Sequence, residues 1–226
     1  MIDLPHPPTG FAVAIDGPGG VGKSTNAKAV AYRLGMTYID TGAMYRAVAL
    51  YATRQGINLH DEAAIAASLP NINIFLHKQQ ILLNGEDITL DIRTQAISES
   101  TSIIASYIPV REKLVAEQKK LAVTGEIVMD GRDIASQVLP WAQVKIYLDA
   151  DIDVRAARRA ADLAAKGHPA DIIKIREEII TRDHRDKTRA HSPLIRTPDA
   201  IYIDTSNMTP GEVVERIVGH IQSARG

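Results

Sequence analysis

The sequence of 226 residues contains no cysteine, so it can form neither a disulfide nor a thiolate metal site, and redox chemistry at cysteine is excluded. It also lacks any uninterrupted apolar stretch long enough to span a bilayer. The first ten residues, MIDLPHPPTG, have neither the basic nor the apolar region of a secretory signal. We therefore expect a cytoplasmic protein with no membrane partner.

Excess charge of one sign is also missing, because the formal net charge is −1. This balance argues against a nucleic-acid partner. The arginines are nevertheless uneven, since eight of the sixteen lie between residues 149 and 196. One interpretation is a solvated helix face, because carboxylates are frequent there too. The other is a mobile clamp for phosphate groups.

Strands and helices alternate along most of the chain, which predicts an α/β fold with a doubly wound parallel sheet in a single domain spanning residues 1–226. Strands are expected at 11–15, 36–40, 126–130, 144–149 and 200–204, and helices at 24–34, 41–55, 153–166, 170–188 and from 209 onward. The pair at 153–166 and 170–188 suggests a helical lid at about 151–190.

The alternation changes after residue 57. A short helix is followed by two strand-like runs, 71–77 and 81–89, joined by a polar turn at 78–80. Helical patterns return at 92–105 and 110–123. We interpret residues 57–123 as an approximate inserted subdomain.

A phosphate-binding loop follows the first strand. The sequence GPGGVGKS, Gly17 to Ser24, matches G-x-x-x-x-G-K-[ST] between a buried strand and a helix start. Such a loop points backbone N–H groups at phosphates, Lys23 reaches the β and γ phosphates, and Ser24 can ligate Mg²⁺. Nucleotide binding is therefore predicted, but GTPases, motors and regulators share this motif.

Arginines outside the loop favour a kinase, which must hold an acceptor phosphate opposite the donor. Arg46 and Arg132 follow predicted strands, and the carboxyl ends of strands line the ligand crevice of open α/β sheets. Arg182, Asp186 and Arg189 are spaced to share one helix face. Taken singly, each arginine could instead form a surface ion pair. No N-K-x-D element is present, which disfavours a GTPase.

The motifs together resemble the bacterial cytidylate kinases, a family of P-loop nucleoside monophosphate kinases. They are IDGPGGVGKST, YIDTGAMYRAVA, IRTQ, MDGRDIASQVLP, KIYLDA, RDHRDKTRAHSPL and IDTS, in family order over nearly the whole chain. The resemblance implies a P-loop NTPase-type fold with an acceptor-binding insert and a lid. It also implies transfer of the ATP γ-phosphoryl group to CMP or dCMP, with Mg²⁺ as cofactor and a monomer as the expected state.

The resemblance also implies roles for individual residues. ATP would be bound by Gly17, Pro18, Gly19, Gly20, Val21, Gly22, Lys23, Ser24, Thr25 and the lid residue Arg159, and the catalytic cations would be Lys23, Arg132, Arg158 and Arg182. The acceptor nucleotide would contact Thr41, Tyr45, Arg46, Ser102, Arg111, Asp133, Asp186 and Arg189. Ser24 would bind Mg²⁺, with Asp130 approaching it through water.

Two departures from the family pattern lie beside the predicted base-reading residues. Ala135 and Ser136 stand where the family usually has glycine and threonine, and Trp141-Ala142-Gln143 where PDA is common. Two alternatives stay open at this point. One is a kinase of the same fold with UMP, AMP or dephospho-coenzyme A as acceptor, and the other is a non-catalytic nucleotide-binding module.

Overall fold

The computed structural model of the protein describes residues 9–77, 80–123, 125–165 and 167–226. Two residues of the predicted 78–80 turn, the start of the chain and Lys166 lie outside these ranges. The described elements are β1 (Ala12–Asp16), α1 (Lys23–Leu34), β2 (Thr37–Asp40), α2 (Thr41–Arg54), α3 (Glu62–Ser68), η1 (Leu69–Asn71), β3 (Ile74–His77), β4 (Gln80–Leu83), β5 (Glu86–Asp87), η2 (Asp91–Arg93), α4 (Gln95–Ile104), α5 (Ile108–Leu121), β6 (Ile127–Asp130), η3 (Ile134–Val138), β7 (Val144–Asp149), α6 (Ile152–Ala165), α7 (Ile172–Thr188), β8 (Ile201–Asp204) and α8 (Pro210–Arg225).

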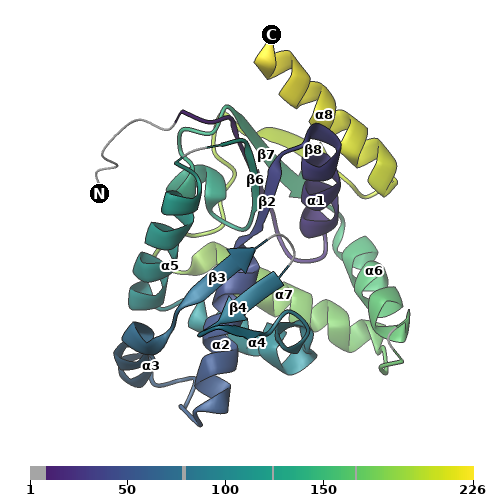
Figure 1. Ribbon diagram of the computed structural model, residues 1–226. Helices are drawn as coiled ribbons and strands as arrows, with labels where there is room; N and C mark the ends of the chain where they lie inside the picture. Colours follow the sequence, from purple (N-terminus) through teal and green to yellow (C-terminus); the bar gives the residue numbers. More distant parts are fainter. Residues whose placement is uncertain (1–8, 78–79, 124, 166) are drawn as a thin grey trace. The chain divides into compact units, whose positions relative to one another are not determined.

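The main sheet of the described chain has five strands in the order β2-β6-β1-β7-β8 (Figure 1). The pairings β1–β6, β1–β7 and β7–β8 are parallel. Neighbouring strands therefore lie on both sides of the central β1, which confirms the predicted doubly wound topology. In such sheets the carboxyl end of the central strand is where ligands bind, and here β1 leads directly into residues 17–22.

The chain divides into two compact units: residues 1–10 with 39–125, and residues 11–38 with 126–226. The second unit has its core between the sheet and the helices α1 and α8, which pack side by side (Figure 1). Val13, Ile15, Ile146 and Ile203 are fully buried there. Helix α8 begins with the predicted capping box between Thr209 and Glu212.

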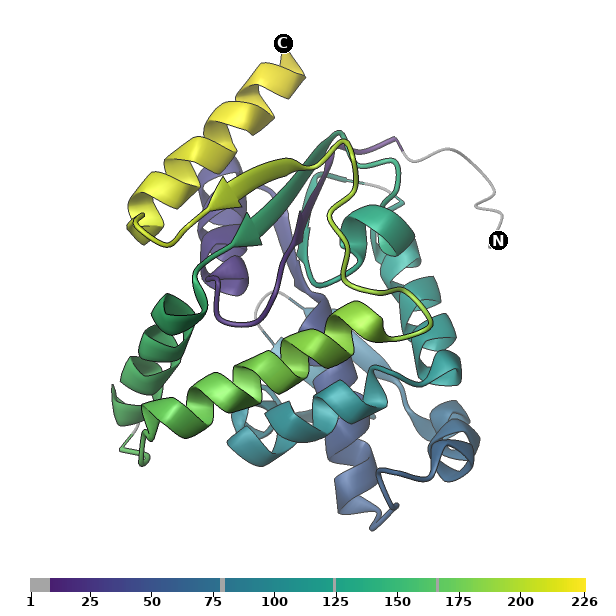
Figure 2. The ribbon, with the colours of Figure 1, turned by 180° about the vertical axis from the view of Figure 1, so that it is seen from behind.

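Helices α6 and α7 also belong to this second unit and pack against each other (Figure 2). Their small core consists of Ala156, Leu163 and Ile175. In the described chain, no helix combines the length and the apolar composition needed to cross a membrane.

The first unit has its own core, built from α2, α4, α5 and a small sheet of order β3-β4-β5. The predicted strand at 81–89 is wrong as a single element. Asn84 and Gly85 have φ angles of 51° and 89°, which form the two-residue turn that Asn-Gly favours and fold the segment back as the β4–β5 hairpin. The main segment of this unit begins at Ile39 and includes α2, which the predicted insert at 57–123 leaves out, so the insert stays a prediction.

Candidate active site

The loop between β1 and α1 depends on glycine for steric reasons. Gly17 has φ 146°, and a Cβ atom built on it would lie 2.0 Å from the Leu148 carbonyl oxygen of the neighbouring strand β7. Gly22 has φ 84° and stands at the N-cap of α1. The first N–H groups of α1 have no partners within the helix, so this end of the helix suits an anion.

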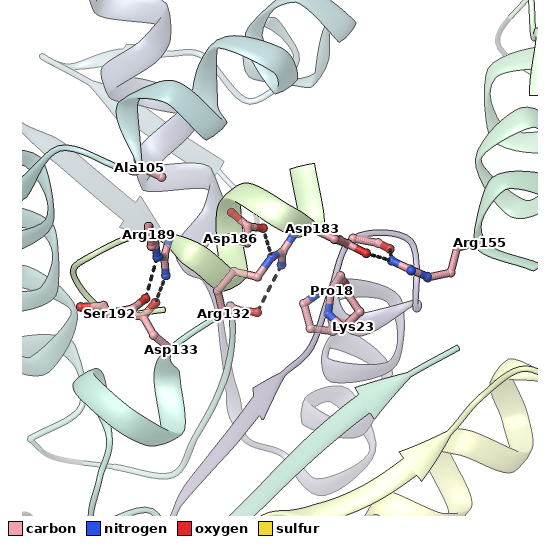
Figure 3. Close-up of polar contacts among 12 residues, drawn as sticks. Pro18, Lys23, Ala105, Arg132, Asp133, Arg155, Asp183, Asp186, Arg189 and Ser192 are labelled. Atoms are coloured by element: carbon pink, nitrogen blue, oxygen red, sulfur yellow. Dashed lines mark hydrogen bonds and ion pairs between the residues drawn. The ribbon is translucent and has the colours of Figure 1, made fainter. Parts of the chain in front are cut away.

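Lys23 is the first residue of α1, and it is 6% exposed. Its Nζ donates a hydrogen bond to the Pro18 carbonyl oxygen at 2.6 Å (Figure 3). Burial holds the pKa of Lys23 well below its ordinary value, and the charges of Arg132 and Arg182 lower it further. Three cationic side chains therefore converge beside the loop, as an anion-binding site requires.

Ser24 and Asp130 meet at the end of the loop. The Ser24 hydroxyl donates to Asp130 Oδ2 at 2.8 Å, and the Tyr38 hydroxyl donates to Asp130 Oδ1 at 2.8 Å. A serine hydroxyl beside a carboxylate is a set of hard oxygen donors of the kind that Mg²⁺ accepts, with water and substrate phosphates completing its shell. These residues therefore fit the predicted ion.

Arg132 is held by the acidic side of α7. Its Nε donates to Asp186 Oδ2 at 2.9 Å (Figure 3), and the side chains are 19% and 7% exposed. Burial opposes the ionised form of Asp186, but Arg132 and Arg182 outweigh it and hold the pKa of Asp186 below its ordinary value. The predicted pair of Arg182 and Asp186 on α7 is thus joined electrostatically to Arg132.

Asp133 and Arg189 form the second ion pair of this cluster. Arg189 Nη2 lies 3.5 Å from Asp133 Oδ1, and both side chains are 6% exposed (Figure 3). The expectation that Arg189 shares a helix face with Arg182 is wrong, because α7 ends at Thr188 and Arg189 has extended backbone angles. Arg189 Nε instead donates to the Ser192 carbonyl oxygen at 2.6 Å.

Within the first unit, Thr41, Tyr45 and Arg46 stand on α2. Asp40 caps this helix by accepting the Ala43 N–H at 2.9 Å, and it also forms an ion pair with Arg46 at 2.8 Å. Thr41 and Tyr45 are buried. Asp40 therefore caps the N-terminus of α2 and also holds the Arg46 guanidinium in place.

A second group in the first unit lies on α4 and α5. The Arg111 guanidinium carbon lies over the Tyr45 ring, 5.5 Å from its centroid, and the guanidinium donates to the Ala105 carbonyl oxygen at 3.1 Å. Ser102 is buried, and its hydroxyl donates to the Glu99 carbonyl oxygen at 3.1 Å. Arg111 and Tyr45, predicted separately from the sequence, are therefore in direct contact.

The predicted lid arginines lie on α6 and are half-buried. Arg158 donates to the Thr205 hydroxyl at 3.1 Å and to the Thr205 carbonyl oxygen at 2.6 Å. Thr205 is buried near the Val21 carbonyl oxygen of the loop, which its hydroxyl reaches at 3.4 Å. Arg158 is thus attached to a residue that itself contacts the phosphate-binding loop.

Comparison with known proteins decides the family. The family model described as cytidylate kinase matches residues 13–223, which is nearly the whole chain. The chain belongs to the cytidylate kinase family. This membership confirms the resemblance drawn from the motifs, and it assigns the chain to the phosphotransferases.

Relatives from this family cover the chain almost end to end. A cytidylate kinase of Geobacillus kaustophilus (strain HTA426) is 47% identical over 212 residues, which is 92% of this chain and 95% of that protein. One of Acholeplasma laidlawii (strain PG-8A) is 45% identical over 217 residues, covering 96% and 97%. A solved gluconokinase structure from Sinorhizobium meliloti 1021 is 12% identical with a TM-score of 0.50, covering 96% of this chain and 94% of its own, so it shares the fold alone.

Three buried charged residues of this cytidylate kinase family member, Asp16, Arg155 and Asp183, have no role among the sequence predictions, although Asp16 and Asp183 lie inside the quoted motifs. Asp16 accepts the N–H groups of Ile134 and Ala135, and Arg155 donates to Asp183 at 2.5 Å and to the Gly19 carbonyl oxygen at 3.2 Å. For Asp16 and Asp183 the available signal was their position, because Asp16 directly precedes Gly17 and Asp183 directly follows Arg182.

Proposed function

We propose that this member of the cytidylate kinase family transfers the γ-phosphoryl group of ATP to CMP or dCMP, giving ADP and CDP or dCDP. The observation that carries the proposal is the place of Arg132, whose Nη2 would lie 3.7 Å from a Cβ atom built at Gly19 of the loop. Arg132 and Arg182 both lower the pKa of the buried Lys23. A nucleotide-binding module needs only the loop and its lysine. Additional arginines at the same point suit a second phosphate, and phosphoryl transfer requires little beyond positioning and charge neutralisation.

The donor half of the site is proposed to consist of Gly17 to Thr25, with Arg158 and Arg159 from α6. Backbone N–H groups and Lys23 would bind the phosphates of ATP. Ser24 would hold Mg²⁺, with Asp130 acting through water, and the ion supplies neutralisation of the charge on the β and γ phosphates. The 2.8 Å contact between Ser24 and Asp130 supports this assignment.

The acceptor residues are proposed in three groups. Thr41, Tyr45, Arg46, Arg132 and Arg182 would bind the acceptor phosphate, while Asp186 and Arg189 would bind the ribose and its neighbouring groups. Ser102, Arg111 and Asp133 would read the base. Support comes from three ion pairs, Arg46 with Asp40, Arg132 with Asp186 and Arg189 with Asp133, which keep these three guanidinium groups in defined places.

Cytosine selectivity follows from the chemistry of Asp133. Cytosine presents an amino donor at C4, which a carboxylate accepts, whereas uracil presents a carbonyl there and would oppose two acceptors. Asp133 is 5% exposed, so an unmatched group beside it is poorly solvated. Each unpaired buried group costs about 1–3 kcal/mol, and two acceptors are left unpaired, which implies a kcat/KM for CMP at least about tenfold above that for UMP.

Residues 57–123 are proposed as the approximate acceptor-binding subdomain and residues 151–190 as the approximate lid. Like-charged arginines in the lid repel one another until phosphates neutralise them, so bound nucleotides should order this segment. Amide hydrogen exchange with and without an ATP analogue plus CMP measures this. Unchanged protection of α6 and α7 would contradict a lid.

An acceptor panel tests the proposed reaction. ADP formation would be measured with CMP, dCMP, UMP, AMP, dephospho-coenzyme A and no acceptor, at saturating Mg-ATP. CMP and dCMP are expected to be used best, and Lys23→Met should reduce kcat by roughly a hundred- to a thousandfold while CMP still binds. Preference for another acceptor would show a different kinase of this fold, and no acceptor-dependent ADP would show a nucleotide-binding module. Sedimentation of the same sample tests the proposed monomer.

A further inference from the structure

The turn after β6 is attached to the end of β1 by three hydrogen bonds. The Gly131 N–H donates to the Ile15 carbonyl oxygen at 3.0 Å and continues the strand pairing. The Ile134 N–H then donates to Asp16 Oδ1 at 2.9 Å, and the Ala135 N–H donates to Asp16 Oδ2 at 2.8 Å. A single carboxylate therefore binds the first two N–H groups of η3.

This turn carries Arg132 and Asp133, two residues of the proposed acceptor site. Both precede η3, a single π-helical turn, which is an uncommon element that often occurs at functional sites. Their side chains pair with Asp186 and Arg189, but backbone contacts of the turn decide where those side chains begin. The backbone at residues 131–135 is therefore a determinant of the site.

We propose that Asp16 is a positioning residue of the acceptor site, whose carboxylate fixes the 131–138 turn, and with it Arg132 and Asp133, to the strand that leads into the phosphate-binding loop. The inference rests on the proposed function, because it assigns the acceptor role to Arg132 and Asp133. It adds a residue that touches neither nucleotide and acts only through the turn. Donor and acceptor groups then share one rigid attachment point at the end of β1.

A carboxyl group, with its two oxygens, suits this position better than an asparagine side chain does. Two diverging N–H groups need two acceptor oxygens, and an asparagine would turn its own NH₂ toward one of them. Asp16 is 2% exposed, and Lys23 and Asp133 are the charged groups that face it. Burial raises the pKa of Asp16 to about 7 even though both N–H groups favour the ionised form. Burial therefore disfavours the ionised form of the carboxyl group at this position.

Asp16→Asn is the decisive variant, and Asp171→Asn is its matched control. Asp171 also accepts two backbone N–H groups, those of Ile173 and Lys174, but both go to the same oxygen, Oδ1, at 3.0 and 3.2 Å. An asparagine at residue 171 keeps that oxygen, whereas an asparagine at residue 16 keeps one acceptor of two. The same chemical change should therefore disrupt one turn and leave the other helix start intact.

Two readouts follow each variant. Amide hydrogen exchange of the nucleotide-free protein, resolved by residue, should quicken at residues 134–138 in Asp16→Asn and stay unchanged in Asp171→Asn. Steady-state kinetics should show the KM for CMP raised about tenfold and the preference for CMP over UMP reduced, with the KM for ATP changed less than about twofold. The control should retain all three values.

The wild-type protein supplies a measurement that does not depend on the variant folding. The amide proton resonances of Ile134 and Ala135 should titrate together with the Asp16 carboxyl resonance. Absence of a common titration, unchanged exchange in Asp16→Asn, or an equal rise in the KM for ATP and CMP would overturn the proposal. If the wild type does not phosphorylate CMP, the proposed function fails, while the exchange and titration results still decide whether Asp16 holds the turn.

Discussion

Two ion pairs join α6 to α7, and their surroundings differ far more than their lengths. Arg155 and Asp183 are 2.5 Å apart with side chains 8% and 10% exposed. Arg176 and Asp153 are 2.6 Å apart with side chains 45% and 73% exposed. The buried pair has a third partner, because Arg155 also donates to the Gly19 carbonyl oxygen in the phosphate-binding loop.

The distance within an ion pair alone therefore says little about what the pair does. A buried pair loses hydration that its own attraction only partly replaces. Among the described residues, Arg155 Nε and Asp183 Oδ1 are buried without hydrogen-bond partners. Stability is therefore a weak reason for its presence. Contact with Gly19 is a better one, since it ties the helix pair to the phosphate-binding loop.

The largest expected effect comes from breaking the buried pair on one side. Arg155→Met leaves the Asp183 carboxylate buried without its counter-charge, which should lower the free energy of unfolding by about 3–5 kcal/mol. Urea denaturation followed by circular dichroism measures the change. A loss below about 1 kcal/mol would mean that Asp183 finds water or another cation, and that the pair is not isolated from solvent.

Asp16 extends the comparison to a buried acid whose partners are neutral N–H groups. Burial raises its pKa from the ordinary value of 3.8 to about 7, so the native state retains a proton that the unfolded chain has released. Its contribution to stability is fully present below pH 3.8 and lost as the pH rises toward 7. The unfolding free energy of the wild type, minus that of Asp16→Asn, should fall by about 1.4 kcal/mol per pH unit across this interval. Parallel curves for the two proteins would contradict the shift.

Replacing both members of the buried pair should separate stability from function. Arg155→Met with Asp183→Leu removes both charges, and the double variant should recover most of the stability lost by Arg155→Met, to within about 1–2 kcal/mol of the wild type. The contact with Gly19 does not return, so the KM for ATP should be raised in the double variant as in Arg155→Met. Recovery of both properties would show that the pair serves packing alone.

The exposed pair should give the smallest effect. Arg176→Ala is expected to change the unfolding free energy by less than about 1 kcal/mol and to leave the KM for ATP unchanged, because solvent screens the pair. Added salt should reduce even this difference. A loss as large as that of Arg155→Met would remove the distinction between the two pairs.

What the sequence could predict was the local and periodic part of the structure. The Gly17–Ser24 motif and the capping box at Thr209 lie within single short segments, and both appear as expected. The β4–β5 hairpin was missed although its Asn-Gly signal was present, because the flanking residues also read as one continuous strand. Local patterns can therefore be lost when two of them overlap.

Contacts between distant segments were not predictable in the same way. Asp16 and Ile134 are 118 positions apart, and Arg155 and Asp183 are 28 apart on two separate helices. No period or spacing relates such residues, so only the folded chain shows that they meet. Arg189 was misplaced for the opposite reason, since helical spacing was extended one residue beyond the end of α7 at Thr188.

The Asn84–Gly85 turn has a consequence for the chemical ageing of the protein. An asparagine followed by glycine is prone to deamidation, because the small glycine lets its backbone nitrogen attack the side-chain amide. In the folded chain that amide is occupied at both ends, since Asn84 Oδ1 accepts the Asn73 N–H and Nδ2 donates to the Asn71 carbonyl oxygen, each at 2.9 Å. Cyclisation must first break these bonds. The turn therefore keeps its own most labile side chain intact for as long as the small sheet stays closed.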